Sequence, residues 1–445
     1  MNRPPEPTDL GQRTSPSAPS STVSKPKWAF PPYTVPAPNA CRLCHTPLRR
    51  TFVDLGMSPL CETYPGPDEL DEMEPFYPLH VFVCEECLLV QLKEYVPPEE
   101  IFRDYPYFSS YSTSWLDHAR RYTEQMTRQM ELGSAHLVVE LASNDGYLLQ
   151  YFQEKGVPVL GVEPARNVAK AAEEKGIPTV PEFFGREFAS TLVDEDRTAD
   201  LLVANNVLAH VPDIHDFVGG VKLLLAPAGR VTMEFPHLLR LMEENQFDTI
   251  YHEHFSYLSL LVVERLFEAH DLQVFHAEEL PTHGGSLRIH AGHNGDASRL
   301  ESDGLHRLRE RERQAGMYEL AFYDGFEERV QGAKRKLMRF LFDAQERGER
   351  VVGYGAPGKG NTLLNYCGAR ADLIEFTVDR NPVKQGRYLP GTRIPIFAPD
   401  RIDEVKPDYI LILPWNLKDE ITTQLEHARS WGARFVVPIP EVEVF

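Results

Sequence analysis

A pair of Cys-x-x-Cys motifs is the feature that most constrains how this chain folds. Cys41 and Cys44 form the first motif, Cys84 and Cys87 form the second, and together they use four of the six cysteines. Two such motifs can bring four thiolates to one ion, which is a tetrahedral set that suits zinc. Because four cysteine ligands leave no position for water or substrate, we predict a structural zinc ion. A catalytic zinc ion, disulfides and free thiols are the alternatives, and iron can replace zinc at thiolate sites.

Length, composition and charge set the class of protein. The chain has 445 residues, of which 42% are hydrophobic and 25% are charged, so we expect a globular protein of about two to four domains. Its formal net charge of −20 disfavours nucleic acid as a partner, because phosphates would be repelled. The sequence shows neither an apolar run of about 18 residues nor a secretory leader pattern. We therefore expect a soluble, cytoplasmic protein that does not act at a membrane.

Composition and hydrophobic pattern divide the chain into four segments. Residues 1–39 are rich in Pro, Ser and Thr and are predicted to form a disordered tail. Residues 40–108 contain the cysteines and short apolar runs typical of strands, which predicts a β-rich zinc-binding module. Residues 109–280 and 281–445 alternate short apolar runs with helical patterns, so we expect two α/β domains there.

The segment that begins near residue 136 has the rhythm of a nucleotide-binding unit. Apolar runs at 136–142 and 159–163 flank a small-residue turn and a helical stretch. In such units the turn after the first strand meets the ligand, and an acid at the end of the next strand binds ribose hydroxyls. This predicts Glu140 and Gly146 near the turn and Glu163 at the ribose. The turn lacks the dinucleotide pattern GxGxxG and fits better as a divergent S-adenosylmethionine turn; an ordinary strand–helix turn is the alternative.

A second glycine-rich turn lies in the C-terminal segment. Gly353, Gly355 and Gly358 follow an apolar run with the spacing GxGxxG, and Asp379 ends the next run. Read alone, this pattern indicates a dinucleotide site. It also approaches a P-loop, but the residue after the lysine is glycine instead of Ser or Thr, which argues against an ATPase.

Several motifs together resemble those of the zinc-containing sugar C-methyltransferases, which methylate C3 of nucleotide-linked 4-keto-deoxysugars. Besides the four cysteines, the motifs are Tyr107-Phe-Ser-Ser-Tyr111, Glu140-Leu-Ala-Ser-Asn-Asp-Gly146, Tyr251-His-Glu-His254, His283-Gly-Gly-Ser-Leu287, the glycine-rich run 353–366 and Asp379-Arg-Asn-Pro382. Their order and number make the resemblance specific, and it extends from Cys41 to the C-terminus.

The resemblance implies a fold, a cofactor and a substrate. The fold is α/β: a β-rich zinc module, a central class I methyltransferase domain that is Rossmann-like, and a C-terminal Rossmann-like domain, with substrate in the cleft between domains. The implied cofactor is S-adenosylmethionine, and the implied substrate is a nucleotide-diphosphate keto-deoxysugar. The predicted cofactor contacts are Glu140, Asn144, Gly146, Glu163 and Asn205, of which Asn205 follows the apolar run 200–204.

Carbon methylation of such a sugar requires a carbanion equivalent at C3. A base can form it, because the neighbouring carbonyl acidifies the C3 hydrogen. His254 is our predicted base, since an imidazole titrates near neutral pH. Similarity to the family places Tyr251 beside the developing enolate oxygen and Glu253 in the same site. It also implies an active-site tyrosine, which is Tyr107 in our prediction, with Tyr105 as the alternative.

Two further choices stay open at this stage. His252 is two residues from His254 and competes with it for the role of base, and the two histidines can ligate one metal ion only from extended structure.

For the substrate, we predict His283 in the cleft and Gly355, Lys359 and Asn361 at the nucleotide diphosphate, since a glycine-rich helix start favours phosphate. The alternative functions are an NAD(P)-dependent oxidoreductase, a nucleotide-sugar-binding protein, and a methyltransferase with another acceptor.

Overall fold

The computed structural model describes residues 39–102, 108–296 and 299–445. The tail predicted over residues 1–39 therefore lies outside the described residues, apart from residue 39. Among the described helices, none combines the length and the apolar composition needed to cross a membrane.

The zinc module is built on a small antiparallel sheet. Its strands are β1 (Arg50–Ser58), β2 (Tyr77–Val83) and β3 (Val90–Leu92). A fourth strand, β9 (Ser256–Tyr257), comes from the central part of the chain and pairs with β3, so that Tyr257 lies opposite Val90. The segment that carries the predicted base is therefore anchored directly to the zinc module.

The central domain contains a seven-stranded sheet in the order β10-β11-β8-β7-β4-β5-β6. The strands are β4 (Val138–Leu141), β5 (Val159–Val162), β6 (Thr179–Val180), β7 (Ala199–Asn205), β8 (Leu225–Pro236), β10 (Leu272–Leu280) and β11 (Ser286–His293). The first five are parallel, and the β10–β11 hairpin adds antiparallel strands beside β8. Every residue of β4 and β5 is buried, as parallel strands covered on both faces require.

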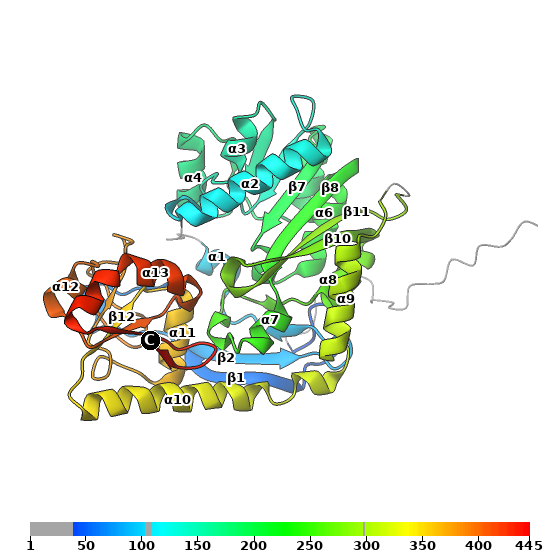
Figure 1. Ribbon diagram of the computed structural model, residues 1–445. Helices are drawn as coiled ribbons and strands as arrows, with labels where there is room; N and C mark the ends of the chain where they lie inside the picture. The colour runs from blue at the N-terminus through cyan, green and yellow to red at the C-terminus, as the bar shows by residue number, and fades with distance from the viewer. Residues whose placement is uncertain (1–38, 103–107, 297–298) are drawn as a thin grey trace, which may run out of the picture.

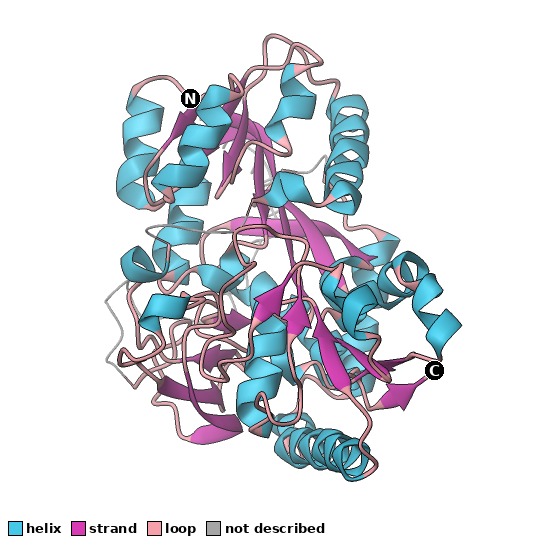
Figure 2. Ribbon diagram, turned by 90° about the vertical axis from the view of Figure 1, so that its left-hand side faces the viewer, coloured by secondary structure: helices cyan, strands magenta, loops and turns pink. Residues whose placement is uncertain are grey.

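Helices cover both faces of this sheet (Figures 1 and 2). They are α2 (Thr113–Met130), α3 (Leu149–Gln153), α4 (Arg166–Glu174), α5 (Arg186–Asp194), α6 (Ile214–Leu224) and α8 (Leu260–Glu268). Strand order reverses at β4, with β5 on one side and β7 on the other. Ligands bind at such a switch point, beyond the carboxyl ends of the strands. The sheet continues through β11, so the boundary predicted after residue 280 falls inside one hairpin.

The C-terminal domain has a second Rossmann-like sheet, in the order β14-β13-β12-β15-β16-β17. The strands are β12 (Val351–Tyr354), β13 (Thr377–Val378), β14 (Ile396–Phe397), β15 (Tyr409–Ile412), β16 (Arg434–Val437) and β17 (Glu443–Val444), of which only β17 is antiparallel to its neighbour. Its helices are α10 (Phe326–Glu346), α11 (Gly358–Cys367), α12 (Arg401–Val405) and α13 (Lys418–Gln424). The predicted α/β class with its zinc module is confirmed.

The zinc module packs against both α/β domains. The Phe52 ring of β1 stacks on the Phe326 ring of α10, with centroids 4.6 Å apart. Figure 1 shows β1 and β2 between α10 and α7 (Leu238–Glu243). The cysteines themselves share a buried cluster with the central domain, while the β1–β3 core belongs to the cluster that includes α10 and α11. The remaining helices are α1 (Pro98–Ile101) and α9 (Asp303–Ala315).

Candidate functional site

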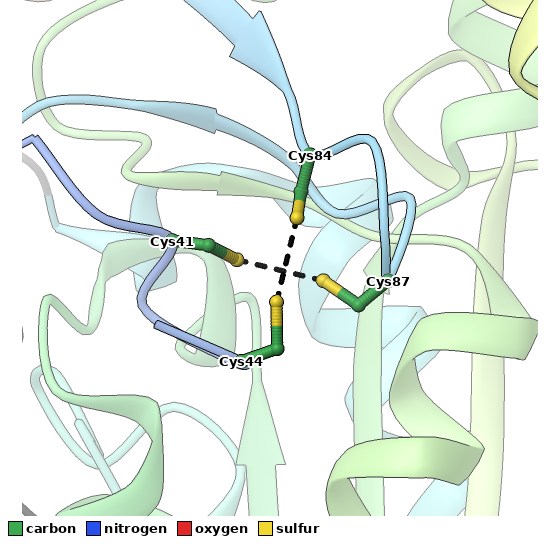
Figure 3. Close-up of side chains that lie close together, drawn as sticks. All are labelled: Cys41, Cys44, Cys84 and Cys87. Carbon is green, nitrogen blue, oxygen red and sulfur yellow. Dashed lines mark hydrogen bonds between the residues drawn. The ribbon is translucent and has the colours of Figure 1, made fainter. Parts of the chain in front are cut away.

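The four motif cysteines converge on one point. Cys41 Sγ lies 3.5 Å from Cys87 Sγ, and Cys44 Sγ lies 3.4 Å from Cys84 Sγ, with the two lines crossing in Figure 3. These distances exclude disulfides, whose sulfurs are about 2.05 Å apart, and they approach the separation of about 3.8 Å expected for four sulfurs held about 2.3 Å from one zinc ion. The donor set therefore fits a closed, structural zinc site.

Both cysteine turns use the same backbone conformation. The residue after each motif, His45 and Leu88, has a positive φ (61° and 64°), and its N–H donates to the carbonyl of the first cysteine at 2.9 and 3.0 Å. Gln91 Nε2 donates to Cys41 Sγ at 3.0 Å, which adds an outer partner to the thiolate.

The cysteine turns are also bonded to the central domain. The His215 ring of α6 contacts the Leu43 carbonyl at 2.8 Å, and Arg265 of α8 donates to the Cys87 carbonyl at 2.8 Å. Metal binding therefore stabilises the contact between the zinc module and the central domain, in addition to the module itself.

The predicted cofactor turn follows β4 at the switch point. Ala142, Asn144 and Gly146 all have positive φ, at 50°, 50° and 75°. A Cβ at Gly146 would lie 2.9 Å from Ile177 Cγ1, so this position requires glycine for both its conformation and its space. The turn thereby brings its backbone close to the carboxyl ends of β4 and β5.

Acidic and amide groups surround this turn. Glu163 accepts from the main-chain N–H groups of Asn144 at 2.9 Å and Ala165 at 2.8 Å, and burial raises its pKa to about 7. Burial raises the pKa of Glu140 well above its ordinary range, with nearby acids adding to the effect. Among the described residues, Glu140 Oε2 and Asn205 Oδ1 are buried without a hydrogen-bond partner. Such orphaned acceptors at a switch point fit a ligand that brings hydroxyl or ammonium donors.

The predicted base, His254, is held in one tautomer by the backbone. Its Nδ1 lies 3.0 Å from the Thr249 carbonyl, which accepts a hydrogen bond but cannot donate one. Nδ1 therefore carries the proton, and Nε2 keeps a lone pair. Burial, helped by neighbouring His210, lowers the pKa of His254 well below its ordinary value. The ring is thus a neutral imidazole, suited to accepting a proton.

Tyr251 and Glu253 lie beside this imidazole. The Tyr251 and His254 ring centroids are 4.1 Å apart. Burial, with nearby Cys61 and Glu253, raises the pKa of Tyr251 well above 10, so its hydroxyl keeps its proton. Glu253 is buried, and its Oε1 lies 3.6 Å from Cys61 Sγ of the zinc module.

His252 has a different environment. Its Nε2 lies 3.3 Å from the Pro78 carbonyl of β2, and its ring packs edge-on against Tyr77. Neither His252 nor His254 belongs to a group of residues that could hold a metal ion within the described part of the chain. The described residues therefore give no support to a metal bound by the pair.

His283 and Lys359 face His254 across domains. His283 is exposed to solvent, and surrounding protein together with the Lys359 charge lowers the pKa of its ring to about 4. Its Nε2 lies 3.2 Å from Asn206 Nδ2. The Lys359 ammonium lies 4.6 Å from the Trp415 ring centroid and donates to Asn416 Oδ1 at 2.9 Å. These residues place basic groups from both α/β domains around one cleft.

Gly355 and Asn361, which were predicted to lie at the nucleotide diphosphate, are packed against other parts of the protein. Gly355 is buried, and a Cβ there would lie 2.6 Å from Pro414 Cδ. Asn361 is 1% exposed, and its Nδ2 donates to the Cys61 carbonyl at 2.6 Å. Both residues are buried by protein, whereas Lys359 is half-buried.

The zinc module covers the glycine-rich turn of the C-terminal domain. The Tyr64 hydroxyl and Lys384 Nζ donate to the Ala356 carbonyl at 2.6 and 2.8 Å, and the Ala356 N–H donates to Asp379 Oδ2 at 2.7 Å. A Cβ at Gly358 would lie 3.1 Å from Glu62 Oε1. Glu62 is paired with Lys384 Nζ at 3.2 Å, so residues of the zinc module occupy the space beside the start of α11.

Sequence reasoning missed several residues of the cleft. The His210 ring lies 4.6 Å from the His254 ring, and Trp415 Nε1 donates to Asp248 Oδ2 at 2.7 Å. Asn205 is the last residue of β7 and His210 lies in the segment that follows it, and this placement beyond a strand end was the available signal. Tyr105 and Tyr107, the two candidates for an active-site tyrosine, lie outside the described residues.

Three family models together match most of the chain. A zinc binding domain matches residues 41–102, a methyltransferase domain matches residues 115–277, and a C-methyltransferase C-terminal domain matches residues 281–440. The C-methyltransferase NovU of Streptomyces niveus is 37% identical over 407 residues, which are 91% of this chain and 96% of the relative.

Solved structures match the chain in part. The PH0226 protein of Pyrococcus horikoshii is 17% identical, with a TM-score of 0.36, over 44% of this chain and 99% of that chain. The magnesium protoporphyrin IX methyltransferase ChlM of Synechocystis with bound SAH is 13% identical, with a TM-score of 0.31, over 40% of this chain and 81% of that chain.

Proposed function

The chain belongs to the C-methyltransferase family that includes NovU, and from this premise we propose that it methylates C3 of a nucleotide-linked 4-keto-deoxysugar. It is an S-adenosylmethionine-dependent enzyme with a structural zinc ion. The acceptor, the reacting carbon and the residue roles below are the proposal. The observation that carries it is the fixed tautomer of His254, which presents a lone pair on Nε2 beside a protonated phenol.

In the proposed reaction His254 Nε2 takes the proton from C3 of the sugar. The electron pair of the broken C–H bond moves onto the C4 oxygen as an enolate. The Tyr251 hydroxyl, whose raised pKa keeps it protonated, donates a hydrogen bond to that oxygen and stabilises its charge. The Thr249 carbonyl accepts from Nδ1 and so stabilises the imidazolium that forms. Bound S-adenosylmethionine supplies an electrophilic methyl group on a sulfonium.

The cofactor and the sugar nucleotide are assigned to opposite sides of the cleft. Glu140, Asn144, Gly146 and Asn205 would hold the cofactor at the switch point. Glu163, which accepts from two main-chain N–H groups of the turn, is assigned to the ribose hydroxyls through its remaining lone pairs. The Lys359 ammonium, which lies over the Trp415 ring, offers charge to the diphosphate, and the His283 ring packs edge-on against the Trp115 ring. Positioning of the two reactants across one cleft is the main contribution expected of the fold.

The direct test is incubation of the full chain with S-adenosylmethionine and thymidine diphosphate 4-keto-2,6-dideoxyglucose. We expect the sugar nucleotide to gain the mass of one methyl group, with the new methyl assigned to C3 by NMR. Methylation at an oxygen or at another carbon would overturn the assignment of the reacting atom, and methylation of other acceptors alone would overturn the assignment of the substrate.

A further inference from the structure

Three ligand-type side chains meet on the β10–β11 hairpin, outside the site described above. His276 and Glu278 are two residues apart on β10, so they share a face of that strand. His276 also stands opposite His290 of β11 in the antiparallel register, which makes the pair direct cross-strand neighbours. The ligand atoms of the three residues all lie within 4.8 Å of one another. Strand register alone thus gathers two imidazoles and one carboxylate.

The His290 imidazole is the most deeply buried member of the three. The residue is 2% exposed, and its Nε2 is buried without a hydrogen-bond partner among the described residues. This nitrogen lies 3.8 Å from Glu278 Oε1, which is too long for a hydrogen bond. Two ligands held about 2.0–2.2 Å from one zinc ion are about 3.3–3.8 Å apart, depending on the angle between them. The separation therefore suits two atoms that share an ion.

His276 and Glu278 each contact a further polar side chain, as metal-binding residues commonly do. His276 Nδ1 lies 2.8 Å from the hydroxyl of Ser302, the residue that caps α9. When Nδ1 donates to this hydroxyl, the lone pair of Nε2 is left for an ion, as is usual for metal-bound histidines. Arg288 contacts Glu278 Oε1 at 3.1 Å and also contacts Glu234 Oε2 at 3.0 Å. Its charge is thus shared between two carboxylates, one of which is Glu278.

We propose that His276, Glu278 and His290 bind a divalent transition metal ion, with Zn²⁺ as the best match to two imidazoles and a carboxylate. This site is distinct from the four cysteines and has three protein ligands, so one coordination position is left for water. Glu234 accepts from Thr282 Oγ1 at 2.8 Å, next to His283. Arg288 links Glu234 to Glu278. An ion bound by β10 and β11 would therefore stabilise the hairpin whose connecting loop carries His283.

Metal content of the full-length protein tests this site. After equilibration with Zn²⁺ and removal of excess metal, wild type should contain about two zinc ions per chain. His290→Ala and Glu278→Gln should each contain about one, because the cysteine site remains. His306→Ala is the matched control, since His306 is an exposed histidine of the adjacent helix α9, and it should contain as much zinc as wild type.

The absorption spectrum of bound Co²⁺ provides a second test of the site, and it needs no variant. Co²⁺ added to protein that retains one zinc ion should produce weak visible d–d bands without the thiolate charge-transfer band, because the second site has no sulfur ligand. A single zinc ion in wild type together with no cobalt spectrum would overturn the proposal. So would a second zinc ion that persists in both His290→Ala and Glu278→Gln, since that ion would be bound elsewhere.

Discussion

At the scale of the residue, backbone carbonyls fix the tautomers of both His252 and His254. The Thr249 carbonyl accepts a hydrogen bond from Nδ1 of His254 and so keeps that nitrogen protonated. His252 instead donates from Nε2 to the Pro78 carbonyl of the zinc module. A neutral imidazole with one free lone pair is the reactive form in general base catalysis. The two histidines differ in which nitrogen is free, Nε2 in His254 and Nδ1 in His252, and our proposal assigns the base to His254.

Replacement of these histidines should separate catalysis from packing. His254→Ala should lower kcat for methyl transfer by about 10²–10⁴-fold, the usual contribution of a general base, with little change in cofactor binding. His252→Ala is the matched control and should lose far less activity, because its ring packs on Tyr77 away from His254. Steady-state kinetics at saturating S-adenosylmethionine provide the comparison. Equal losses in the two variants would contradict the assignment.

The pH dependence of the rate should follow from the two shifted pKa values. The pKa of His254 is lowered by burial, so the base stays neutral as the pH falls past about 6.5, the ordinary value, and activity is lost only in more acidic buffer. The pKa of Tyr251 is raised, so its hydroxyl stays a donor beyond pH 10. We expect a broad plateau in kcat/KM between these limits. An acidic limb centred above pH 6.5 would contradict it.

At the scale of the element, the turn after β4 is the proposed cofactor site. Its pattern could be predicted from the sequence, because alternating apolar runs and a lone glycine are local signals. The partner of Glu163 could not be predicted, since a carboxylate at a strand end can bind either a ribose or the main chain. In the structure it accepts from the N–H groups of Asn144 and Ala165, and it supports the turn.

A substitution at Gly146 should test this turn. Gly146→Ala combines a φ of +75° with a Cβ 2.9 Å from Ile177 Cγ1, and we expect a loss of about 1–3 kcal/mol in the free energy of unfolding together with weaker binding of S-adenosylhomocysteine. Gly133→Ala is the control, because a Cβ there meets no atom within 4 Å. Chemical denaturation and calorimetry measure both effects. Unchanged cofactor affinity in Gly146→Ala would remove the turn from the binding site.

At the scale of the whole molecule, the zinc module joins the two α/β domains at the cleft. It supplies Cys61 beside Glu253, pairs β3 with β9 next to His254, and covers the start of α11 with Tyr64. The paired cysteine motifs predicted the metal from four residues alone. The cover over the C-terminal glycine-rich turn could not be predicted, because Cys61 and Asn361 are 300 positions apart and no local pattern links them.

Loss of the zinc ion should therefore act on catalysis as well as on stability. Cys44→Ser should lose one zinc ion per chain and several kcal/mol of unfolding free energy, about what a structural zinc site contributes to a small module, and methyl transfer should fall with it. Cys367→Ser is the control, because Cys367 is a buried free cysteine outside the four-cysteine site. Metal analysis and denaturation report on the two variants. Full activity in zinc-free Cys44→Ser would contradict the role given to the module.

The central claim is that His254 removes the C3 proton, and hydrogen–deuterium exchange at C3 of the sugar nucleotide tests it most directly. The reaction is run in deuterated buffer without S-adenosylmethionine and followed by mass spectrometry. We predict exchange at C3 with wild type and with His252→Ala, and none with His254→Ala. Exchange that continues unchanged in His254→Ala, or wild-type methyl transfer without any exchange under these conditions, would contradict this account.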